Sequence, residues 1–262
     1  MSVLLVNEKD GVAWLTLNRP ERLNALDPAL VTALREYFER LDARSSARVV
    51  VLQGAGRAFC AGLDLKEQAS GADLGVADML QQQKGIRDIM LAMRRCPQPV
   101  ISVVQGAASG GGFALALASD VRLATPDARM NAAFIRIGLT ACDVGVSYFL
   151  PRMVGSSVAA EYMLTGRFMD AQRAYALGLV SRVAPLPELQ VEAQAMALDM
   201  LNATPLALRL TKEALGLAVD AGSMEAVIAM EDRNQVLCTQ TRDFREGMEA
   251  FLQKRPPRYT GR

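Results

Sequence analysis

Two glycine-containing stretches, GAGRAFCAGLDLKE (residues 54–67) and QGAASGGGFALALASD (residues 105–120), decide the fold of this chain. Each follows a short apolar run rich in β-branched residues, RVVVLQ at 48–53 and VISVV at 100–104, as expected of a buried strand. In the second stretch, three consecutive glycines (110–112) stand where the strand passes into a helix-prone run of Ala and Leu. Both stretches therefore predict a strand, a tight loop and a helix in succession.

The segments on either side continue this alternation of strands and helices. Apolar runs at 3–6 and 12–17 flank Asp10-Gly11, a two-residue turn signal that predicts a β-hairpin. Strands and helices that alternate in this way predict right-handed crossovers and a largely parallel sheet. Further elements are expected at 28–43 (helix), 70–78 (mobile loop), 79–95 (helix) and 121–124 (strand).

After about residue 185 the strand signals stop, and helical patterns continue to about Lys254. We therefore predict an α/β chain in two parts: a core at 1–185 that carries the glycine loops, and a helical region at 186–262. The length of 262 residues and the hydrophobic share of 51% are sufficient for a substantial core.

Composition excludes several classes of function. Basic and acidic side chains nearly balance, 29 against 28, so neither nucleic acid nor an anionic membrane is expected as the main partner. The chain has no histidine, which excludes Ser-His-Asp and Cys-His nucleophile systems and most zinc sites. We expect no metal site and no cofactor. Four scattered cysteines without a CxxC pair suit reduced thiols, and the short apolar run at the N-terminus does not form a signal peptide, so a cytoplasmic location is expected.

Each glycine stretch, taken alone, can be a simple turn between strand and helix, or a cradle for a phosphate. Neither contains the GxGxxG pattern of dinucleotide sites or the P-loop pattern of nucleotide triphosphatases. Together they offer two backbone N–H groups at neighbouring strand ends. Such a pair is an oxyanion hole, which stabilises negative charge that develops on a substrate oxygen during reaction.

Six motifs in one order carry a resemblance that covers almost the whole chain: NRPERLNAL (18–26), RAFCAGLDLKE (57–67), GAASGGGFALALASD (106–120), IGLTACDVGVSYFLPRMVG (137–155), LTGRFMDAQRAYALGLVSRV (164–183) and DFREGMEAFLQKRPPRY (243–259). The chain resembles the crotonase (enoyl-CoA hydratase/isomerase) superfamily. The resemblance implies a spiral of ββα turns with a helical C-terminal region, assembled as a homotrimer or a dimer of trimers. It also implies a CoA thioester substrate, with coenzyme A as part of the substrate.

The resemblance assigns roles to particular residues. The N–H groups of Leu63 and Gly111 would form the oxyanion hole, and Arg22 and Lys254 would contact CoA, although both are equally well explained as solvated surface charges. The positions that it places at the substrate or CoA are Arg22, Leu23, Ala61, Leu63, Asp64, Leu65, Lys66, Phe134 and Lys254.

Hydratases of this family use two glutamates, and this chain has neither. The corresponding positions are Ala114, three residues beyond the central glycine, and Phe134, four residues before Gly138. One carboxylate remains nearby, Asp143, in a loop that carries an aspartate in the similar dienoyl-CoA isomerases and ring-epoxide phenylacetyl-CoA isomerases. Asp143 can alternatively be the N-cap of the helix that follows, which includes Val146.

Three functions are consistent with this pattern. The first is an enoyl-CoA isomerase in which Asp143 shuttles one proton, because a 1,3-proton shift needs only one base and an oxyanion hole. The second is an enoyl-CoA hydratase or related lyase that uses Asp143 and a positioned water. The third is a non-catalytic relative that binds acyl-CoA or RNA, with RNA disfavoured because the chain lacks a basic excess.

Overall fold

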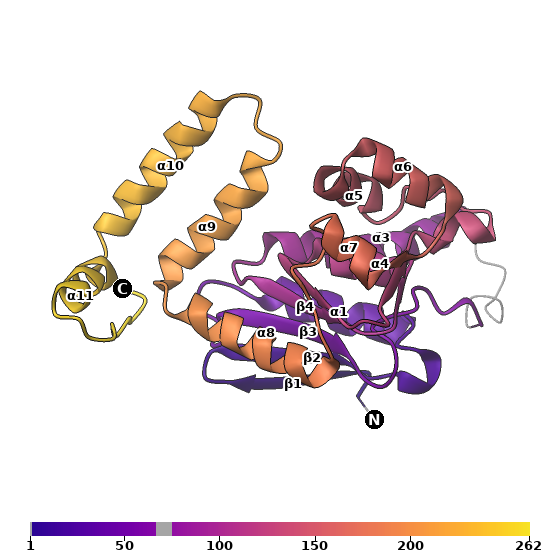
Figure 1. The fold of residues 1–262 in the computed structure, drawn as a ribbon, viewed down its shortest axis with the longest axis horizontal. Coiled ribbons are helices and arrows are strands. Elements are labelled where there is room, and N and C mark those ends of the chain that lie inside the picture. Colours follow the sequence, from indigo (N-terminus) through magenta and orange to yellow (C-terminus); the bar gives the residue numbers. More distant parts are fainter. Residues whose placement is uncertain (1, 67–74) are drawn as a thin grey trace.

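The computed structural model describes residues 2–66 and 75–262, and its main feature is one six-stranded sheet. The strands lie in the order β1-β2-β3-β4-β6-β9 (Figure 1). The first pair is antiparallel and the other pairs are parallel, which confirms the predicted sheet. The bounds are β1 Leu4–Lys9, β2 Val12–Leu17, β3 Val49–Gly54, β4 Val100–Val104, β6 Val121–Ala124 and β9 Arg182–Val183.

The predicted hairpin forms as its turn residues require. Asp10 and Gly11 both have positive φ, 51° and 81°, and the connection pairs Lys9 with Val12. Two central residues with positive φ match the twist of the flanking strands, and Asp-Gly tolerates this conformation well.

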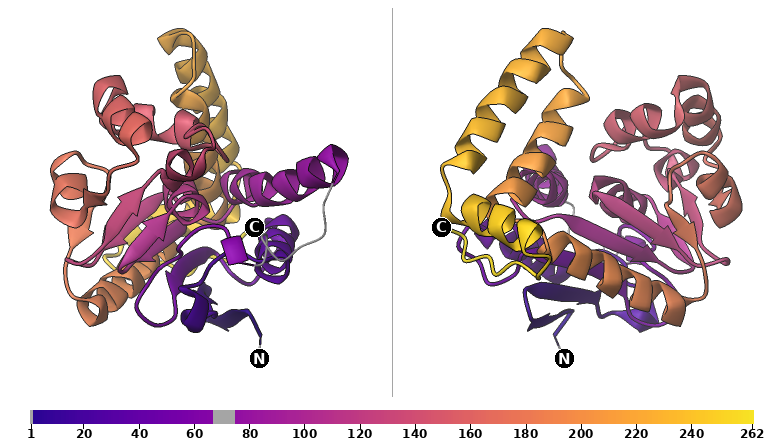
Figure 2. Two further views of the ribbon diagram at one scale, coloured as in Figure 1. Left: turned by 90° about the vertical axis from the view of Figure 1, so that its right-hand side faces the viewer. Right: turned by 60° about the vertical axis from the view of Figure 1, so that its left-hand side comes forward.

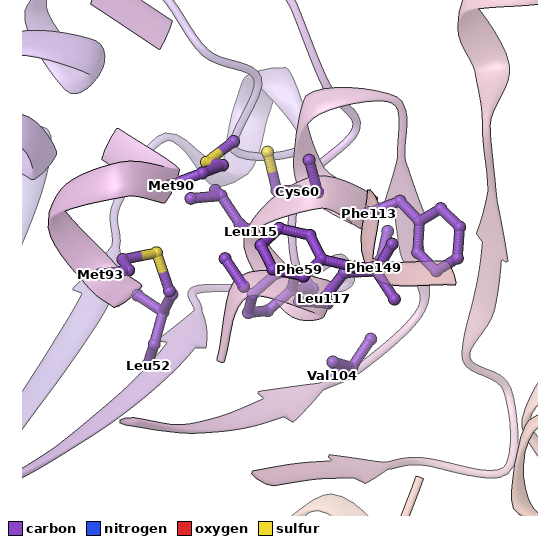
Figure 3. Packing of buried hydrophobic residues seen from close by; sticks show 14 of the residues in the cluster. Leu52, Phe59, Cys60, Met90, Met93, Val104, Phe113, Leu115, Leu117 and Phe149 are labelled. Atoms are coloured by element: carbon purple, nitrogen blue, oxygen red, sulfur yellow. The ribbon is translucent and has the colours of Figure 1, made fainter. Parts of the chain in front are cut away.

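Helices cover both faces of the sheet, because strand residues alternate between them. On one face, Val50 and Leu52 pack against α1 (Pro28–Arg40), α3 (Val76–Arg95) and α4 (Gly111–Ala118); Figure 3 shows part of this cluster. On the other face, the two valines that alternate with them in β3 pack against α8 (Leu186–Leu201). The helix expected at 28–43 is present, but it ends earlier than predicted, at Arg40. The helix expected from residue 79 begins at Val76, and the rest of the predicted mobile loop lies mostly outside the described residues.

A second, smaller sheet lies beside the ends of these strands. It has the order β5-β7-β8, from β5 (Ala107–Ser109), β7 (Arg129–Asn131) and β8 (Met169–Asp170). The elements that follow are the 3-10 helix η2 (Ala133–Ile137), α5 (Val146–Val154), α6 (Ser156–Thr165) and α7 (Ala171–Ala176). This layer carries the second glycine loop and the loop that contains Asp143.

The last three helices form an arm that leaves the core, as Figures 1 and 2 show: α9 (Pro205–Ala218), α10 (Met224–Thr239) and α11 (Arg242–Leu252). In the described part of the chain, Lys212 is the one buried side chain of α9, and α10 buries none. The Lys212 ammonium donates to the carbonyls of Met93 (3.0 Å) and Gln98 (2.6 Å) and pairs with Asp120 (3.1 Å). This buried polar cluster helps to hold the start of the arm on the core, together with Leu208, which packs against the apolar cluster on the sheet. The predicted boundary at 185/186 between the core and the helical region stays a prediction. α8, which begins at this boundary, packs on the sheet of the core.

The tip of the arm also touches the layer beside the glycine loops. Asp220, just after α9, accepts a hydrogen bond from the Tyr148 hydroxyl and pairs with Arg152 at 2.9 Å. Both partners lie on α5. No helix among the described residues is long and apolar enough to cross a lipid bilayer.

Candidate functional site

The two glycine loops lie side by side because the first one pairs with the edge of β5 as a short extra strand. The Cys60 amide donates to the Ala107 carbonyl at 3.0 Å, and the Ser109 amide donates to the Cys60 carbonyl at 3.0 Å. One step earlier, the Phe59 amide donates to the Gln105 carbonyl at 2.7 Å. These three bonds fix the separation of the loops.

Glycine is required where the loops approach most closely. Gly62 has φ +93°, and a methyl group there would lie 2.7 Å from the Ser109 carbonyl oxygen and 3.4 Å from the Gly111 nitrogen. A methyl group on Gly112 would fall onto the Cys60 carbonyl oxygen and lie 2.7 Å from Cys60 Cβ. Any larger side chain at these two positions would push the loops apart.

Two backbone N–H groups remain available at this contact. Leu63 forms a bridge with Leu26, but the bonds of that bridge use the carbonyl of Gly62 and the amide of Asp64. Gly111 is the first residue of α4, where helix geometry leaves the N–H without an intrahelical partner. Neither the Leu63 nor the Gly111 N–H has an acceptor within the described part of the chain. This pair has the character of an oxyanion hole, and the positive end of α4 adds to it.

A buried ion pair supports the first loop from behind. Arg19 pairs with Asp64 at 3.0 Å and with Asp27 at 3.1 Å, and all three side chains are largely buried. Asn24, fully buried, donates to the Ala58 carbonyl at 2.7 Å. Sequence reasoning placed Asp64 at the substrate and did not single out Arg19 or Asn24. The signal available for both was their position in the NRPERLNAL motif.

The other predicted residues of this loop lie at different depths. The Ala61 amide donates to the Leu23 carbonyl at 3.0 Å, so Leu23 lies directly beside the loop, and Arg22 is exposed next to it. Leu65 and Lys66 are exposed at the last described positions before residue 75. The buried Cys60 is no nucleophile here, since burial raises the pKa of its thiol to about 12.

Lys254 does not join this group within one chain. It follows α11, which lies at the opposite end of the molecule from α5 and α6 (Figure 1). Its side chain is exposed.

Apolar side chains occupy the two positions that the sequence resemblance matches to the glutamates of hydratases. Ala114 is fully buried in α4. Phe134, in η2, is 8% exposed, and its ring lies so close to Gly110 that a methyl group there would be 3.4 Å from ring atom Cε1. The wall beside the two N–H groups is therefore hydrophobic at both positions.

Asp143 lies in the turn before α5, and this helix packs against α4, whose first residue is Gly111. Its Oδ1 accepts hydrogen bonds from the Val144 amide (2.8 Å) and from the Gln83 side chain on α3. Burial raises the pKa of Asp143 above its ordinary value, and these two hydrogen bonds lower it in part. A partly buried carboxylate with a raised pKa is a kind of group that can accept and return a proton.

Asp143 is not the N-cap of α5, contrary to the structural alternative drawn from the sequence. The N-cap is Gly145, which provides no side-chain hydrogen bond, and the Asp143 side chain bonds to Val144 and Gln83 instead. The reason is conformational, because Val144 and Gly145 both have positive φ, 37° and 94°, and turn the chain between Asp143 and the helix. A strained φ at a β-branched residue is characteristic of functional sites.

Among the described residues, no three His, Cys, Asp or Glu side chains come together in a way that could hold a metal ion.

Comparisons with known proteins give a consistent result over the whole chain. The sequence profile of the enoyl-CoA hydratase/isomerase family matches residues 7–262. A probable enoyl-CoA hydratase of Mycobacterium tuberculosis is 40% identical over 265 residues, which cover 98% of this chain and 92% of the relative. The 1,2-epoxyphenylacetyl-CoA isomerase of Escherichia coli is 33% identical and covers all of both chains.

Solved structures show the same fold. The enoyl-CoA hydratase of Bacillus anthracis superposes with a TM-score of 0.93 at 34% identity, over 99% of this chain and 100% of the other. The enoyl-CoA hydratase of Mycobacterium smegmatis gives a TM-score of 0.89 at 36% identity, over 98% of each chain. The predicted spiral of ββα turns with a helical C-terminal region is thus confirmed.

The close approach of the loops gives a first prediction. Gly112→Ala should lower the free energy of unfolding by about 3 kcal/mol, because the added methyl overlaps the Cys60 carbonyl and forces the loops apart. Gly85→Ala is the matched control, since its methyl meets Val31 at an ordinary 3.6 Å inside α3 and should stabilise by about 0.5–1 kcal/mol. Urea unfolding of both variants checks this; equal stability of Gly112→Ala and the unmodified protein would contradict the assigned contact.

Proposed function

The chain belongs to the enoyl-CoA hydratase/isomerase family, whose members act on acyl-CoA thioesters, and on that basis we propose that it is an enoyl-CoA isomerase with Asp143 as its proton shuttle. In this proposal the N–H groups of Leu63 and Gly111 bind the thioester oxygen. The substrate is a CoA thioester with a double bond in its acyl chain.

The proposed reaction is a 1,3-proton shift that needs no other reactant. Two hydrogen bonds to the thioester oxygen make the adjacent C–H acidic, and the Asp143 carboxylate removes that proton. The electron pair moves onto the oxygen as a dienolate, which the two N–H groups stabilise. Asp143, now protonated, returns the same proton to a carbon two positions away, and the double bond moves.

The observation that carries the proposal is the combination of one carboxylate of raised pKa with apolar side chains at Ala114 and Phe134. Hydration needs a group that activates water and a group that protonates carbon, normally two carboxylates. An isomerase needs one. The carboxylates of Asp64 and Asp27 are both paired with Arg19 and support the first loop.

Hydration is the second candidate, because the relative from Mycobacterium tuberculosis carries the name of a probable enoyl-CoA hydratase. In that case Asp143 would activate a positioned water and then return its proton to the carbon next to the thioester. The E. coli relative, named as an isomerase, supports the first candidate.

The proposed assembly is a homotrimer or a dimer of trimers, formed with further copies of this chain. The arm supports it, because its helices expose large apolar side chains that the core of the same chain does not cover: Leu215, Leu217, Met224, Ile228, Val236, Leu237, Met248, Phe251 and Leu252. In such an assembly Lys254 would reach the CoA of a neighbouring subunit, while Arg22 and Leu23 would contact the CoA bound by their own chain.

The oxyanion hole is tested by Gly111→Pro. Proline removes the N–H but fits the first position of a helix, so the fold should remain and turnover should fall 100- to 1000-fold, about 3–4 kcal/mol of transition-state stabilisation. Gly111→Ala is the control, because it adds a methyl and keeps the N–H; the methyl meets the flexible end of Leu26 at 2.9 Å. Circular dichroism checks folding, and a folded proline variant with near-normal rate would place the oxyanion elsewhere.

The base is tested by Asp143→Asn. An amide cannot take a proton from carbon, so isomerisation and exchange of substrate protons with solvent should both fall by two to four orders of magnitude. Binding of the CoA ester should change less than a few-fold, since the oxyanion hole is untouched. An Asn variant that keeps the full rate would end the proposal for Asp143.

A further inference from the structure

The Asp143 carboxylate is held by one of its two oxygens. Oδ1 accepts both the Val144 amide and the Gln83 side-chain amide. Oδ2 accepts no hydrogen bond from the described residues. A carboxylate fixed in this way keeps one oxygen anchored and one available to exchange a proton with another molecule.

The two donors come from different parts of the fold. Val144 belongs to the turn that carries Asp143, and its amide is in place because the turn has the positive φ described above. Gln83 comes from α3, 60 residues earlier in the chain. The turn alone offers one hydrogen bond, which leaves the carboxylate free to rotate about it. A second donor from another element removes that freedom.

The core fixes the position of α3. Its second half buries Ile89, Met90 and Met93, and the two methionines are part of the cluster in Figure 3. The helix packs on α1 and on α4, which begins at Gly111. The Gln83 side chain is exposed and thus adds little to that packing. The clearest interaction of Gln83 in the described structure is the one with Asp143.

We propose that Gln83 is a positioning residue that holds Oδ1 of Asp143 and directs Oδ2 at the substrate carbon. This inference rests on the proposed function, because it deepens the role of Asp143. It assigns to α3, which the sequence predicts only as a helix, a direct part in orienting the base relative to the proposed oxyanion hole.

Charged and titratable groups on the surrounding elements do not replace Gln83. None of them forms a hydrogen bond or ion pair with the Asp143 carboxylate in the described part of the chain, and Tyr148 and Arg152 are engaged by Asp220. These groups are Lys84, Arg87 and Asp88 on α3, Arg136 on η2, Cys142 in the same turn, and Tyr148 and Arg152 on α5.

The direction in which Gln83 shifts the pKa of Asp143 follows from its role as a hydrogen-bond donor. A hydrogen bond to the ionised carboxylate favours the charged form, so the Gln83 amide lowers the pKa of Asp143, against burial, which raises it. Removal of the amide raises the pKa. A second carboxylate at the same place raises it further, because two like charges at hydrogen-bond distance cannot both ionise easily.

The test is a carbon-13 NMR titration of the Asp143 carboxyl group in the full-length protein and three variants. Gln83→Met keeps length and volume without the donor and should raise the pKa by about one unit. Gln83→Glu should raise it more. Gln82→Met is the matched control. Gln82 is exposed and forms no hydrogen bond with the described residues, so this variant should leave the pKa of Asp143 unchanged. A pKa unchanged in Gln83→Met, or raised equally by Gln82→Met, overturns the proposal.

Kinetics on an enoyl-CoA provide the second readout. Gln83→Met should reduce kcat roughly tenfold or more because the Asp143 carboxylate loses its fixed orientation, while KM stays within a few-fold. The acid limb of the pH profile should move to higher pH, because the pKa of Asp143 rises. If Gln83 only stabilises the fold, Gln83→Met lowers the melting temperature and leaves the acid limb of the pH profile in place. That result would contradict a positioning role.

The expected order of Asp143 pKa values in the NMR titration is highest in Gln83→Glu, lower in Gln83→Met and lowest in the unmodified protein. If the titration gives this order and Asp143→Asn nevertheless stays fully active, the Gln83 contact is supported and the proposed function is wrong.

Discussion

The close backbone approach of the two glycine loops is the constraint on which the site depends. Cys60 joins the edge of β5, and the absence of side chains at Gly62 and Gly112 lets the loops meet. That contact leaves the amides of Leu63 and Gly111 without protein acceptors among the described residues, so they can bind a substrate oxygen. The buried Arg19–Asp64 pair and the α4 helix hold the two sides in place. The proposed oxyanion hole is thus a property of backbone geometry, and side chains around it can change the chemistry without disturbing it.

In the proposed function, side chains around the two amides determine which reaction the chain performs. Ala114 and Phe134 remove both carboxylates that a hydratase uses, and Asp143 supplies one from the neighbouring turn. A single carboxylate, partly desolvated and anchored on one oxygen, has the properties of a base that removes a proton and returns it. On these grounds we propose that the scaffold performs a proton shift rather than the addition of water.

The sequence predicts most of the fold because its main strands are β-branched runs and its hairpin has an Asp-Gly turn. The strands β5, β7 and β8 have two or three residues each, too few for any periodicity, and they form only in contact with one another and with the first loop. The motifs point to Leu63, Gly111 and Asp143, and their roles stay a prediction, whereas the Gln83–Asp143 contact joins residues 60 positions apart and needs the three-dimensional structure. The N-cap role considered for Asp143 failed because Val144 and Gly145 turn the backbone first.

The most direct measurement is proton NMR of the unmodified protein with 2-enoyl-, 3-enoyl- and dienoyl-CoA thioesters in deuterated water. It follows double-bond position, hydration and deuterium uptake in one experiment. The proposed single-carboxylate mechanism predicts migration of the double bond in at least one of these thioesters, without a hydroxyacyl product. Accumulation of a 3-hydroxyacyl-CoA, with no migration in any of them, would contradict the mechanism and would show that Asp143 and a water molecule perform hydration instead.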